Sequence, residues 1–351
     1  MAALLEVSDL AVDFHTDDGV FRAVDHVGFN LEPGRALGIV GESGCGKSVT
    51  ALSIMGLVPQ PPGRIASGTI RFEGTDLLRL APAALRALRG DALAMIFQEP
   101  MTSLNPAFTI GEQIVEGLIR HRRVSRTEAR EHGIEMLRRV RIPSPESRFD
   151  AYPHHLSGGM RQRAMIAMAL VCSPKLLIAD EPTTALDVTI QAQILDLMRM
   201  LRQESGAAVM LITHDLGVVA EFADDVVVMY AGRVVEQASV RSLFAMPQHP
   251  YTIGLLGSIP RLDLAQRRLA NIRGQVPMRL SRVRGCAFAP RCPFATRQCR
   301  EESPPLENKA GDSDVHLAAC WHAPLDPHAM PRDPARPAAT GAAETTSAPA
   351  S

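Results

Sequence analysis

The residues of this 351-residue chain that could most clearly do chemistry form the octapeptide GESGCGKS at positions 41–48. It fits the pattern G-x-x-x-x-G-K-[ST] and follows an apolar run, residues 36–40, that is expected to be a buried strand. Glycines at such a turn let backbone N–H groups surround phosphates, while a lysine reaches the outer phosphates and a serine hydroxyl binds Mg²⁺. We therefore expect a nucleotide-binding loop made by Gly41, Ser43, Gly44, Cys45, Gly46, Lys47 and Ser48.

Two neighbouring carboxylates end a second apolar run, LLIADE at residues 176–181. Asp180, at the end of the expected strand, is placed to hold Mg²⁺. Glu181 comes next and could polarise an attacking water molecule as a general base. Acidic residues at a strand end are common, but downstream of a phosphate loop they predict nucleotide hydrolysis.

A second anion-binding site is predicted by the stretch LSGGMRQR at residues 156–163. Ser157, Gly158 and Gly159 would open a helix, and the free backbone N–H groups at a helix N-terminus attract anions. Two anion sites in one domain suggest that the nucleotide is held between two such domains.

The elements expected to position these motifs alternate between strand and helix. Apolar runs at 175–182, 208–214 and 224–232 are typical of strands, and a helical pattern at 188–204 separates the first two. Such alternation predicts an α/β fold with a mostly parallel sheet and crossover helices. Residues from about 106 to 165 interrupt it and are expected to form a helical insertion.

Charge and hydropathy limit the possible partners. With 37 basic and 38 acidic residues the formal net charge is -1, which argues against a broad basic face for nucleic acid. No apolar run approaches the roughly 18 to 20 residues that a membrane-spanning helix needs. The N-terminus lacks the pattern of a cleaved signal peptide. We expect the chain to stay in the cytoplasm, with any membrane role being peripheral.

Together, in this order and at these spacings, the motifs across residues 4–240 resemble those of an ABC-type ATPase. The resemblance implies that family's fold, with an antiparallel β part at the N-terminus, and binding of ATP with Mg²⁺. It makes Glu181 the catalytic carboxylate. It also makes Ser157, Gly158 and Gly159 the signature motif, which completes the ATP site of a partner domain.

Further single residues match motifs of the same family. Gln98, in MIFQEP, resembles the Q-loop glutamine, which senses Mg²⁺ and meets the membrane subunits. Asp187 resembles the D-loop aspartate, and His214 resembles the switch histidine that contacts the γ-phosphate. Phe14 is the better match for the aromatic ring that stacks on adenine, with Phe21 as its rival.

The C-terminal third narrows the resemblance to one group within the family. The phrases MPQHPYTIGLLGSIPRLD, IRGQVP and CAFAPRCPFATRQC, with FQEPMTSLNPAFTIGEQI earlier, resemble the Opp/Dpp (peptide/nickel) importer ATPases. We expect an ATPase domain at 4–255, a Cys-rich region at 256–325 and a disordered tail at 326–351. Long coiled coils, typical of DNA-repair relatives, and a second ATPase domain, typical of translation-associated relatives, are both missing from the pattern.

The resemblance implies the partners and the role. The chain would be the ATP-hydrolysing subunit of an importer at the cytoplasmic face of the membrane. It would act with two membrane-spanning permeases, a second ATPase subunit and an extracytoplasmic solute-binding protein. Di- or oligopeptides are the expected cargo, nickel chelates or another small solute are the alternative, and a soluble non-transport ABC ATPase is a weaker one.

Four cysteines gather near the C-terminus, at Cys286, Cys292, Cys299 and Cys320. A reducing cytoplasm disfavours disulfides between them. They lack the C-x₂₋₄-C spacing of most zinc sites and suit a [4Fe–4S] cluster at least as well. Some members of the resembled group hold such a cluster, so we expect it ahead of zinc, with unligated thiols as the remaining alternative.

Overall fold

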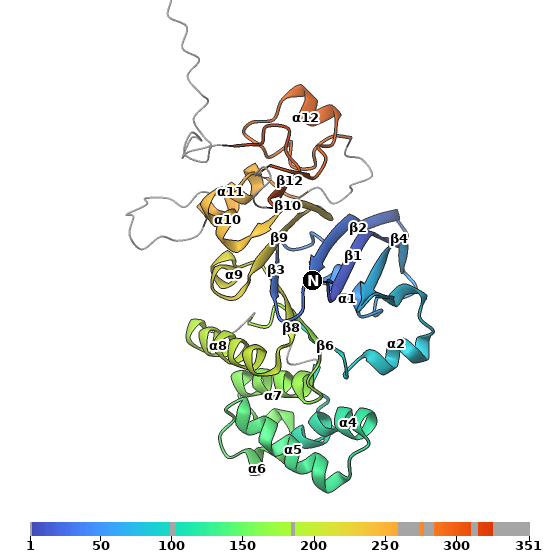
Figure 1. Ribbon diagram of the computed structural model, residues 1–351, viewed down its shortest axis with the longest axis vertical. Helices are drawn as coiled ribbons and strands as arrows, with labels where there is room; N and C mark the ends of the chain where they lie inside the picture. Colours follow the sequence, from blue (N-terminus) through green and yellow to red (C-terminus); the bar gives the residue numbers. More distant parts are fainter. Residues whose placement is uncertain are drawn as a thin grey trace, which may run out of the picture.

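The computed structural model describes residues 2–98, 103–183, 187–258, 272, 274–276, 284–309 and 315–325. Two β-sheets organise these residues, with helices packed around them (Figure 1). The predicted tail at 326–351 lies outside the described residues. Within the described residues, no helix combines the length and the apolar composition needed to cross a membrane.

The smaller sheet is antiparallel, as expected for the N-terminal part, and lies to the right in Figure 1. Its strands follow the order β2, β1, β4, β5. The first two form a hairpin in which Thr16 pairs with Gly19 and Phe14 pairs with Phe21. The strands are β1 (Leu5–Thr16), β2 (Gly19–Leu31), β4 (Gly63–Phe72) and β5 (Thr75–Asp76).

The larger sheet begins at one edge with β11 (Glu307–Asn308), β12 (Leu317–Ala318) and β10 (Arg233–Ser239), followed in order by β9, β3, β8, β7 and β6. The strands from β9 to β6 in this order are parallel neighbours, which confirms the mostly parallel sheet. Parallel strands are covered on both faces, which explains why their sequences are apolar throughout. These strands are β3 (Ala36–Val40), β6 (Leu93–Ile96), β7 (Leu176–Asp180), β8 (Ala208–Thr213) and β9 (Asp225–Tyr230).

Alternation along each strand sends successive side chains to opposite faces of this sheet. Leu176 and Ile178 of β7 join the apolar cluster that contains α1 (Lys47–Ile54) and the smaller sheet. Leu177 and Ala179 join the cluster that contains α7 (Gly158–Leu170) and α8 (Val188–Ser205). The helix after the phosphate loop and the helix after the Ser-Gly-Gly motif therefore cover opposite faces.

The predicted helical insertion is observed and forms the lower part of the molecule in Figure 1. Capping boxes start two of its helices, with Thr109 and Glu112 at one N-terminus and Ser125 and Glu128 at the other. Phe149 is buried where these helices cross. The helices are α4 (Ile110–Arg122), α5 (Arg126–Arg139) and α6 (Pro145–Phe149), with a 3₁₀ turn at η2 (Pro153–His155).

The C-terminal residues extend the larger sheet instead of standing apart from it. Strand β10 (Arg233–Ser239) turns back from β9 and pairs with β12 (Leu317–Ala318), which in turn pairs with β11 (Glu307–Asn308). The sequence pattern of this region shows little periodicity, so these two short strands were not predicted. The remaining elements are η1 (Leu77–Arg79), α2 (Pro82–Leu88), α9 (Leu216–Phe222), α10 (Val240–Ala245), α11 (Pro250–Gly257) and α12 (Arg297–Glu301).

A buried carboxylate anchors this C-terminal segment. Glu236 of β10 is fully buried and lies 2.7 Å from the ring Nε2 of His316, just before β12. It also accepts hydrogen bonds from the backbone N–H groups of Gln248 and His249, at 2.5 and 3.0 Å. One side chain thus joins three stretches of chain.

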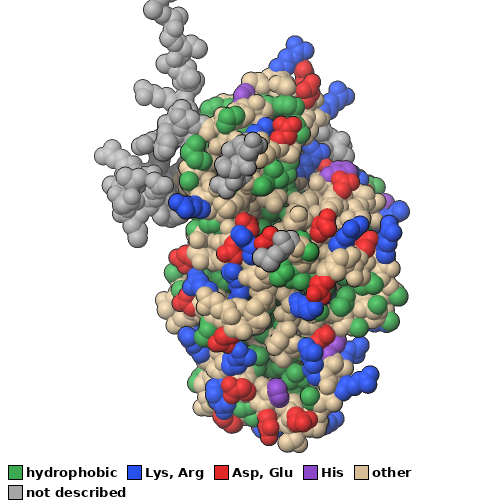
Figure 2. All heavy atoms as spheres, viewed as in Figure 1, with side chains coloured by type: hydrophobic (Ala, Val, Ile, Leu, Met, Phe, Trp, Pro, Cys, Tyr) green, Lys and Arg blue, Asp and Glu red, His purple; other side chains and the backbone are tan. Residues whose placement is uncertain are grey.

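The surface carries both signs of charge. On the face drawn in Figure 2, Lys and Arg side chains are interspersed with Asp and Glu side chains over all parts of the molecule. This face therefore presents no broad basic area of the kind that nucleic acid would require.

Candidate ATP site

The phosphate loop follows β3 and needs its glycines for steric reasons. Gly41 and Gly46 have φ angles of 154° and 98°, which side-chain-bearing residues rarely adopt. A Cβ atom at Gly41 would lie 2.2 Å from the Met229 carbonyl oxygen, and one at Gly46 would lie 2.5 Å from that of Ala23. The backbone of the loop therefore packs directly against neighbouring strands.

Lys47 closes the loop on itself. Its ammonium group donates to the carbonyl oxygens of Gly41 and Glu42, at 2.7 and 3.1 Å, and the residue is 5% exposed. Cys45 is buried, and its carbonyl oxygen accepts from the N–H of Gly232 at 3.0 Å. Ser43 and Gly44 are exposed at the tip. The predicted loop residues therefore form one structural unit with a fixed base and an open tip.

The Ser48 hydroxyl donates to Oδ1 of Asp180 at 3.1 Å, which brings together the two residues predicted to bind Mg²⁺. Burial raises the pKa of Asp180; the hydrogen bond from Ser48 lowers it, and the charge of Glu181 raises it further. A hydroxyl and a buried carboxylate are hard oxygen donors of the kind that Mg²⁺ prefers, so these residues fit the ion.

Gln98, Glu181 and His214 meet at the carboxyl edge of the larger sheet. Each follows one of three adjacent parallel strands, β6, β7 and β8. Gln98 Nε2 donates to Glu181 Oε2 at 3.2 Å, and His214 Nδ1 lies 3.6 Å from Glu181 Oε1. The Glu181 side chain is 12% exposed and that of His214 is 63% exposed. The carboxylate is thus sheltered while the imidazole faces solvent.

The Ser-Gly-Gly motif starts α7 as predicted. Ser157 caps the helix by accepting from the N–H of Met160, and both Ser157 and Gly158 are exposed. A Cβ atom at Gly158 would meet no heavy atom within 4 Å. Because α7 covers the face opposite α1, this helix terminus is presented to solvent, away from the cluster in which the chain's own phosphate loop is packed.

Asp187 and the two candidate aromatic rings are also placed by the structure. Asp187 caps α8 by accepting from the N–H of Ile190 at 3.0 Å, while residues 184–186 before it lie outside the described residues. Phe14 and Phe21 face each other across the β1–β2 hairpin. Phe14 packs against the core of the smaller sheet. The stacking role of Phe14 stays a prediction.

The predicted iron–sulfur cluster is wrong, and so is its zinc alternative. Cys286, Cys292, Cys299 and Cys320 line one small cavity of about 10 Å³. Even so, among the residues that the structure describes, no group of three or more His, Cys, Asp or Glu side chains is arranged to hold a metal ion. Burial raises the pKa of Cys286, Cys320 and Cys292, the last to about 12, which favours neutral thiols over the thiolates that metals require.

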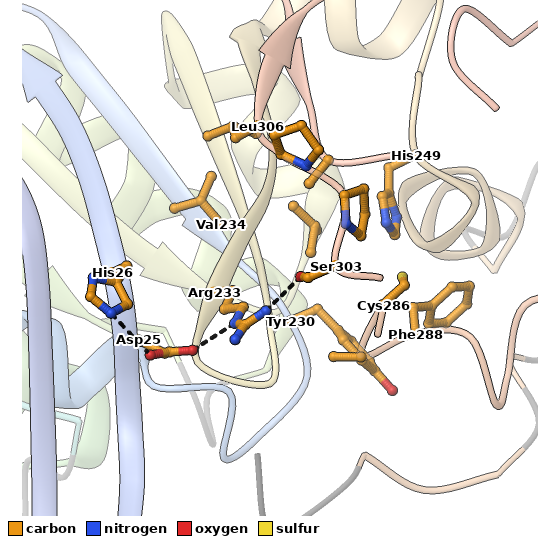
Figure 3. A pocket seen from close by; sticks show the side chains of 15 residues that line it. Asp25, His26, Tyr230, Arg233, Val234, His249, Cys286, Phe288, Ser303 and Leu306 are labelled. Carbon is orange, nitrogen blue, oxygen red and sulfur yellow. Dashed lines mark hydrogen bonds and ion pairs between the residues drawn. The ribbon is translucent and has the colours of Figure 1, made fainter. Parts of the chain in front are cut away.

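A larger cavity, of about 390 Å³, lies between the C-terminal segment and the two sheets (Figure 3). Tyr230, Cys286 and Phe288 are among the side chains that line it. Its polar side is built by Asp25, whose carboxylate accepts from Arg233 at 2.6 Å. Arg233 donates in turn to Ser303 of the C-terminal segment at 2.7 Å.

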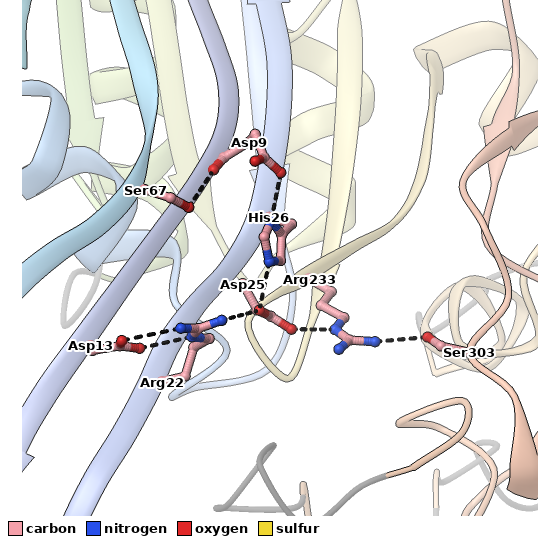
Figure 4. Close-up of polar contacts among 8 residues, drawn as sticks. All are labelled: Asp9, Asp13, Arg22, Asp25, His26, Ser67, Arg233 and Ser303. Atoms are coloured by element: carbon pink, nitrogen blue, oxygen red, sulfur yellow. Dashed lines mark hydrogen bonds and ion pairs between the residues drawn. The ribbon is translucent and has the colours of Figure 1, made fainter.

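The same aspartate continues a polar chain into the smaller sheet (Figure 4). Arg22 donates to Asp25 at 3.2 Å and to Asp13 at 2.8 Å. Burial opposes ionisation of Asp25, but the hydrogen bonds from Arg233 and Arg22 hold its pKa below the usual value. The chain of charges therefore connects β1, β2 and β10 to the C-terminal segment.

Two side chains that touch the phosphate loop were not found from the sequence. The Tyr251 hydroxyl accepts from the backbone N–H of Glu42 at 2.9 Å, and Arg291 lies 2.9 Å from its carboxylate. Tyr251 and Arg291 follow Glu42 in the chain by 209 and 249 residues, respectively. No local pattern marks such distant contacts.

Comparisons with known proteins agree with this geometry. The family described as ABC transporter matches residues 24–184, and the family described as oligopeptide/dipeptide transporter, C-terminal region, matches residues 235–299. A probable peptide ABC transporter ATP-binding protein of Sinorhizobium fredii is 58% identical over 320 residues, covering 91% of this chain and 94% of that protein. The chain belongs to the oligopeptide/dipeptide group of ABC transporter ATP-binding proteins.

Other relatives of this ABC ATPase support the assignment. The dipeptide transport ATP-binding protein DppD of Escherichia coli is 50% identical over 329 residues, covering 94% of this chain and 99% of that protein. A dimeric bacterial ABC transporter cassette of known structure has a TM-score of 0.61 at 28% identity, over 68% of this chain and 99% of the other. A dimeric post-hydrolysis cassette bound to ADP and Pi has the same TM-score at 27% identity and the same coverage.

Proposed function

We propose that this ABC ATPase is the ATP-hydrolysing subunit of an importer for di- or oligopeptides. Support comes from relatives named for peptide and dipeptide transport, which match more than nine-tenths of the chain. It would work at the cytoplasmic face of the membrane with two permeases, a second ATPase subunit and an extracytoplasmic solute-binding protein. The ATPase domain would span residues 4–255, followed by a Cys-rich region at 256–325 and a disordered tail at 326–351.

ATP binding would use the phosphate loop. Lys47 would turn from the Gly41 and Glu42 carbonyl oxygens toward the outer phosphates, and the backbone N–H groups of the exposed tip would donate to phosphate oxygens. Ser48 and Asp180 would hold Mg²⁺, which when bound offsets part of the phosphate charge. The hydrogen bond between these two residues keeps their oxygens together in advance.

Hydrolysis would depend on Glu181 as the general base. Its carboxylate is sheltered, and Gln98 and His214 approach its two oxygen atoms from the adjacent strands. Such contacts fix the direction of the oxygens, which a base needs in order to take a proton from a positioned water molecule. Gln98 would sense bound Mg²⁺, and His214 would contact the γ-phosphate of ATP. This convergence of three side chains is the observation that carries the proposal.

Two chains would be required for a complete site. Ser157, Gly158 and Gly159 present a free helix N-terminus to solvent, on the sheet face opposite α1. In the proposed dimer this terminus, with Asp187, would close the partner's ATP site, while the helical residues at 106–165 and Gln98 would face the permeases. Closing and opening of the dimer would then move the permeases.

Substitution of Glu181 by Gln tests the proposal, because it keeps the side-chain shape and removes the base. We expect ATP hydrolysis by the assembled transporter to fall at least about 100-fold. The variant should still bind ATP. With ATP bound, the ATPase subunits should form a stable dimer, which size-exclusion chromatography of the isolated subunits detects. Glu221→Gln, the same change at an exposed position of α9, is the matched control. Hydrolysis at the wild-type rate by the Glu181→Gln transporter would reject Glu181 as the base.

The cargo is tested by uptake in a strain lacking this gene. Loss of labelled dipeptide or oligopeptide uptake, restored by the wild-type chain and not by the Glu181→Gln chain, is the expected result. Loss of nickel uptake with intact peptide uptake would favour the alternative cargo.

A further inference from the structure

Glu42, the second residue of the phosphate loop, is held from two sides by residues beyond the nucleotide-binding motifs. Its backbone N–H donates to the hydroxyl of Tyr251, a fully buried residue of α11. Its carboxylate lies 2.9 Å from the guanidinium of Arg291, which belongs to the cysteine-containing segment. The loop that receives ATP is therefore fixed in part by the C-terminal region.

Arg291 is itself held firmly in place. Its side chain is only 5% exposed, and it donates to the Ile272 carbonyl oxygen at 3.1 Å and to the Tyr230 hydroxyl at 3.4 Å. The guanidinium lies 5.7 and 6.0 Å from the ring centres of Tyr230 and Phe288. A turn in which the Arg291 N–H donates to the Phe288 carbonyl oxygen fixes the backbone. Little conformational freedom remains to be lost when the ion pair forms.

Charge makes this contact relevant to ATP. The carboxylate of Glu42 lies on a loop whose neighbouring backbone groups are expected to surround a polyanionic triphosphate. An unpaired carboxylate there would repel the phosphates, and partial shielding from solvent strengthens such repulsion. The Glu42 side chain is 29% exposed, so solvent screens it only in part. Pairing with Arg291 offsets the negative charge and holds the carboxylate at a fixed place.

We propose that Arg291 is a positioning residue for ATP binding, which acts by neutralising Glu42 and, together with Tyr251, by fixing the conformation of the phosphate loop. The C-terminal region would thus contribute to the ATP site of its own chain. This proposal rests on the chain being an ABC ATPase and is independent of the cargo.

A double-mutant cycle on the full-length chain tests it, with a fluorescent ATP analogue as the probe. We expect Arg291→Ala to weaken analogue binding about tenfold, because about 1.4 kcal/mol of repulsion would be exposed. In a Glu42→Gln background, which carries no charge to neutralise, the same change should weaken binding less than about twofold. Wild-type chain that fails to bind the analogue would instead contradict the ATPase assignment itself.

Controls separate positioning from simple loss of structure. Arg297→Ala removes another arginine of the same region, whose side chain is 88% exposed, and should leave binding unchanged. Arg291→Gln serves if Arg291→Ala lowers the unfolding temperature. In the assembled transporter, Arg291→Ala should raise the KM for ATP and leave kcat within about twofold. Equal weakening in both Glu42 backgrounds, or no weakening in either, would overturn the proposal.

Discussion

Ser48 and Asp180 are 132 residues apart in the chain, and a hydrogen bond of 3.1 Å joins their side chains. The bond connects the start of α1 to the end of β7, so it forms only when α1 packs against the sheet that contains β7. It also holds a carboxylate in a buried place where the charged form is disfavoured, since burial raises the pKa of Asp180.

We predict that Asp180→Asn stabilises the nucleotide-free chain while abolishing hydrolysis. When folding raises the pKa of a carboxyl group, the folded chain loses stability as pH rises from the ordinary pKa through the raised one, so ionisation of Asp180 costs folding free energy. Asparagine removes this charge and can still accept from Ser48. Thermal unfolding without nucleotide should show a Tm raised by about 2 °C. A lowered Tm would contradict the assigned cause of the pKa shift.

We predict that Gly46→Ala prevents ATP binding and destabilises the chain. Alanine rarely adopts the φ angle of 98° found at this position, and its Cβ atom would lie 2.5 Å from the carbonyl oxygen of Ala23. The expected cost is about 2 kcal/mol of unfolding free energy, measured by urea denaturation. Gly74→Ala is the matched control, because Gly74 has a φ of 78° but open space around its Cβ position. If both variants bound ATP equally, the steric argument would fail.

We predict a pH dependence of stability that originates at His249. Its Nδ1 accepts from the N–H of Tyr251 at 3.1 Å, and burial lowers its pKa to about 4, although the charge of Glu236 acts in the opposite direction. Between pH 6.5 and 4 the unfolded chain binds a proton that the folded chain does not, so stability falls as pH falls.

The loss attributable to His249 is roughly 3 kcal/mol across this range. His249→Asn keeps an acceptor for the Tyr251 N–H and does not titrate, so its stability should fall less steeply between pH 6.5 and 4. Urea denaturation at a series of pH values measures the difference. Parallel curves for the wild type and the variant would show that other groups cause the acid sensitivity.

Local chemistry made a large part of this architecture predictable. Lys47 of the phosphate loop and the capping residues Ser157 and Asp187 make their contacts with their own sequence neighbours. Apolar runs of strand length predict parallel strands, and the carboxyl ends of parallel strands meet at one edge of a sheet. The approach of His214 to Glu181 follows from that rule, because each residue lies at the end of a predicted strand.

The cysteine cluster shows where such reasoning fails. Spacing and resemblance favoured a metal site, but ligation depends on where side chains point and on how burial shifts their pKa. Burial raises the pKa of Cys292 to about 12, a consequence of the packing of distant segments around it. Spacing along the chain contains no information about that environment.

The sequence alone determined the strands β3, β7, β8 and β9, the phosphate loop, the helix that follows Ser157 and the family, because each depends on neighbouring residues or on a linear pattern. Only the tertiary structure decided that β12 pairs with β10, that Tyr251 and Arg291 hold Glu42, and that the four C-terminal cysteines lack metal-binding geometry. Those last features, which concern the residues that the structure describes, arise from contacts between segments far apart in the chain. Their energies depend on burial and orientation, which are set when the whole domain packs.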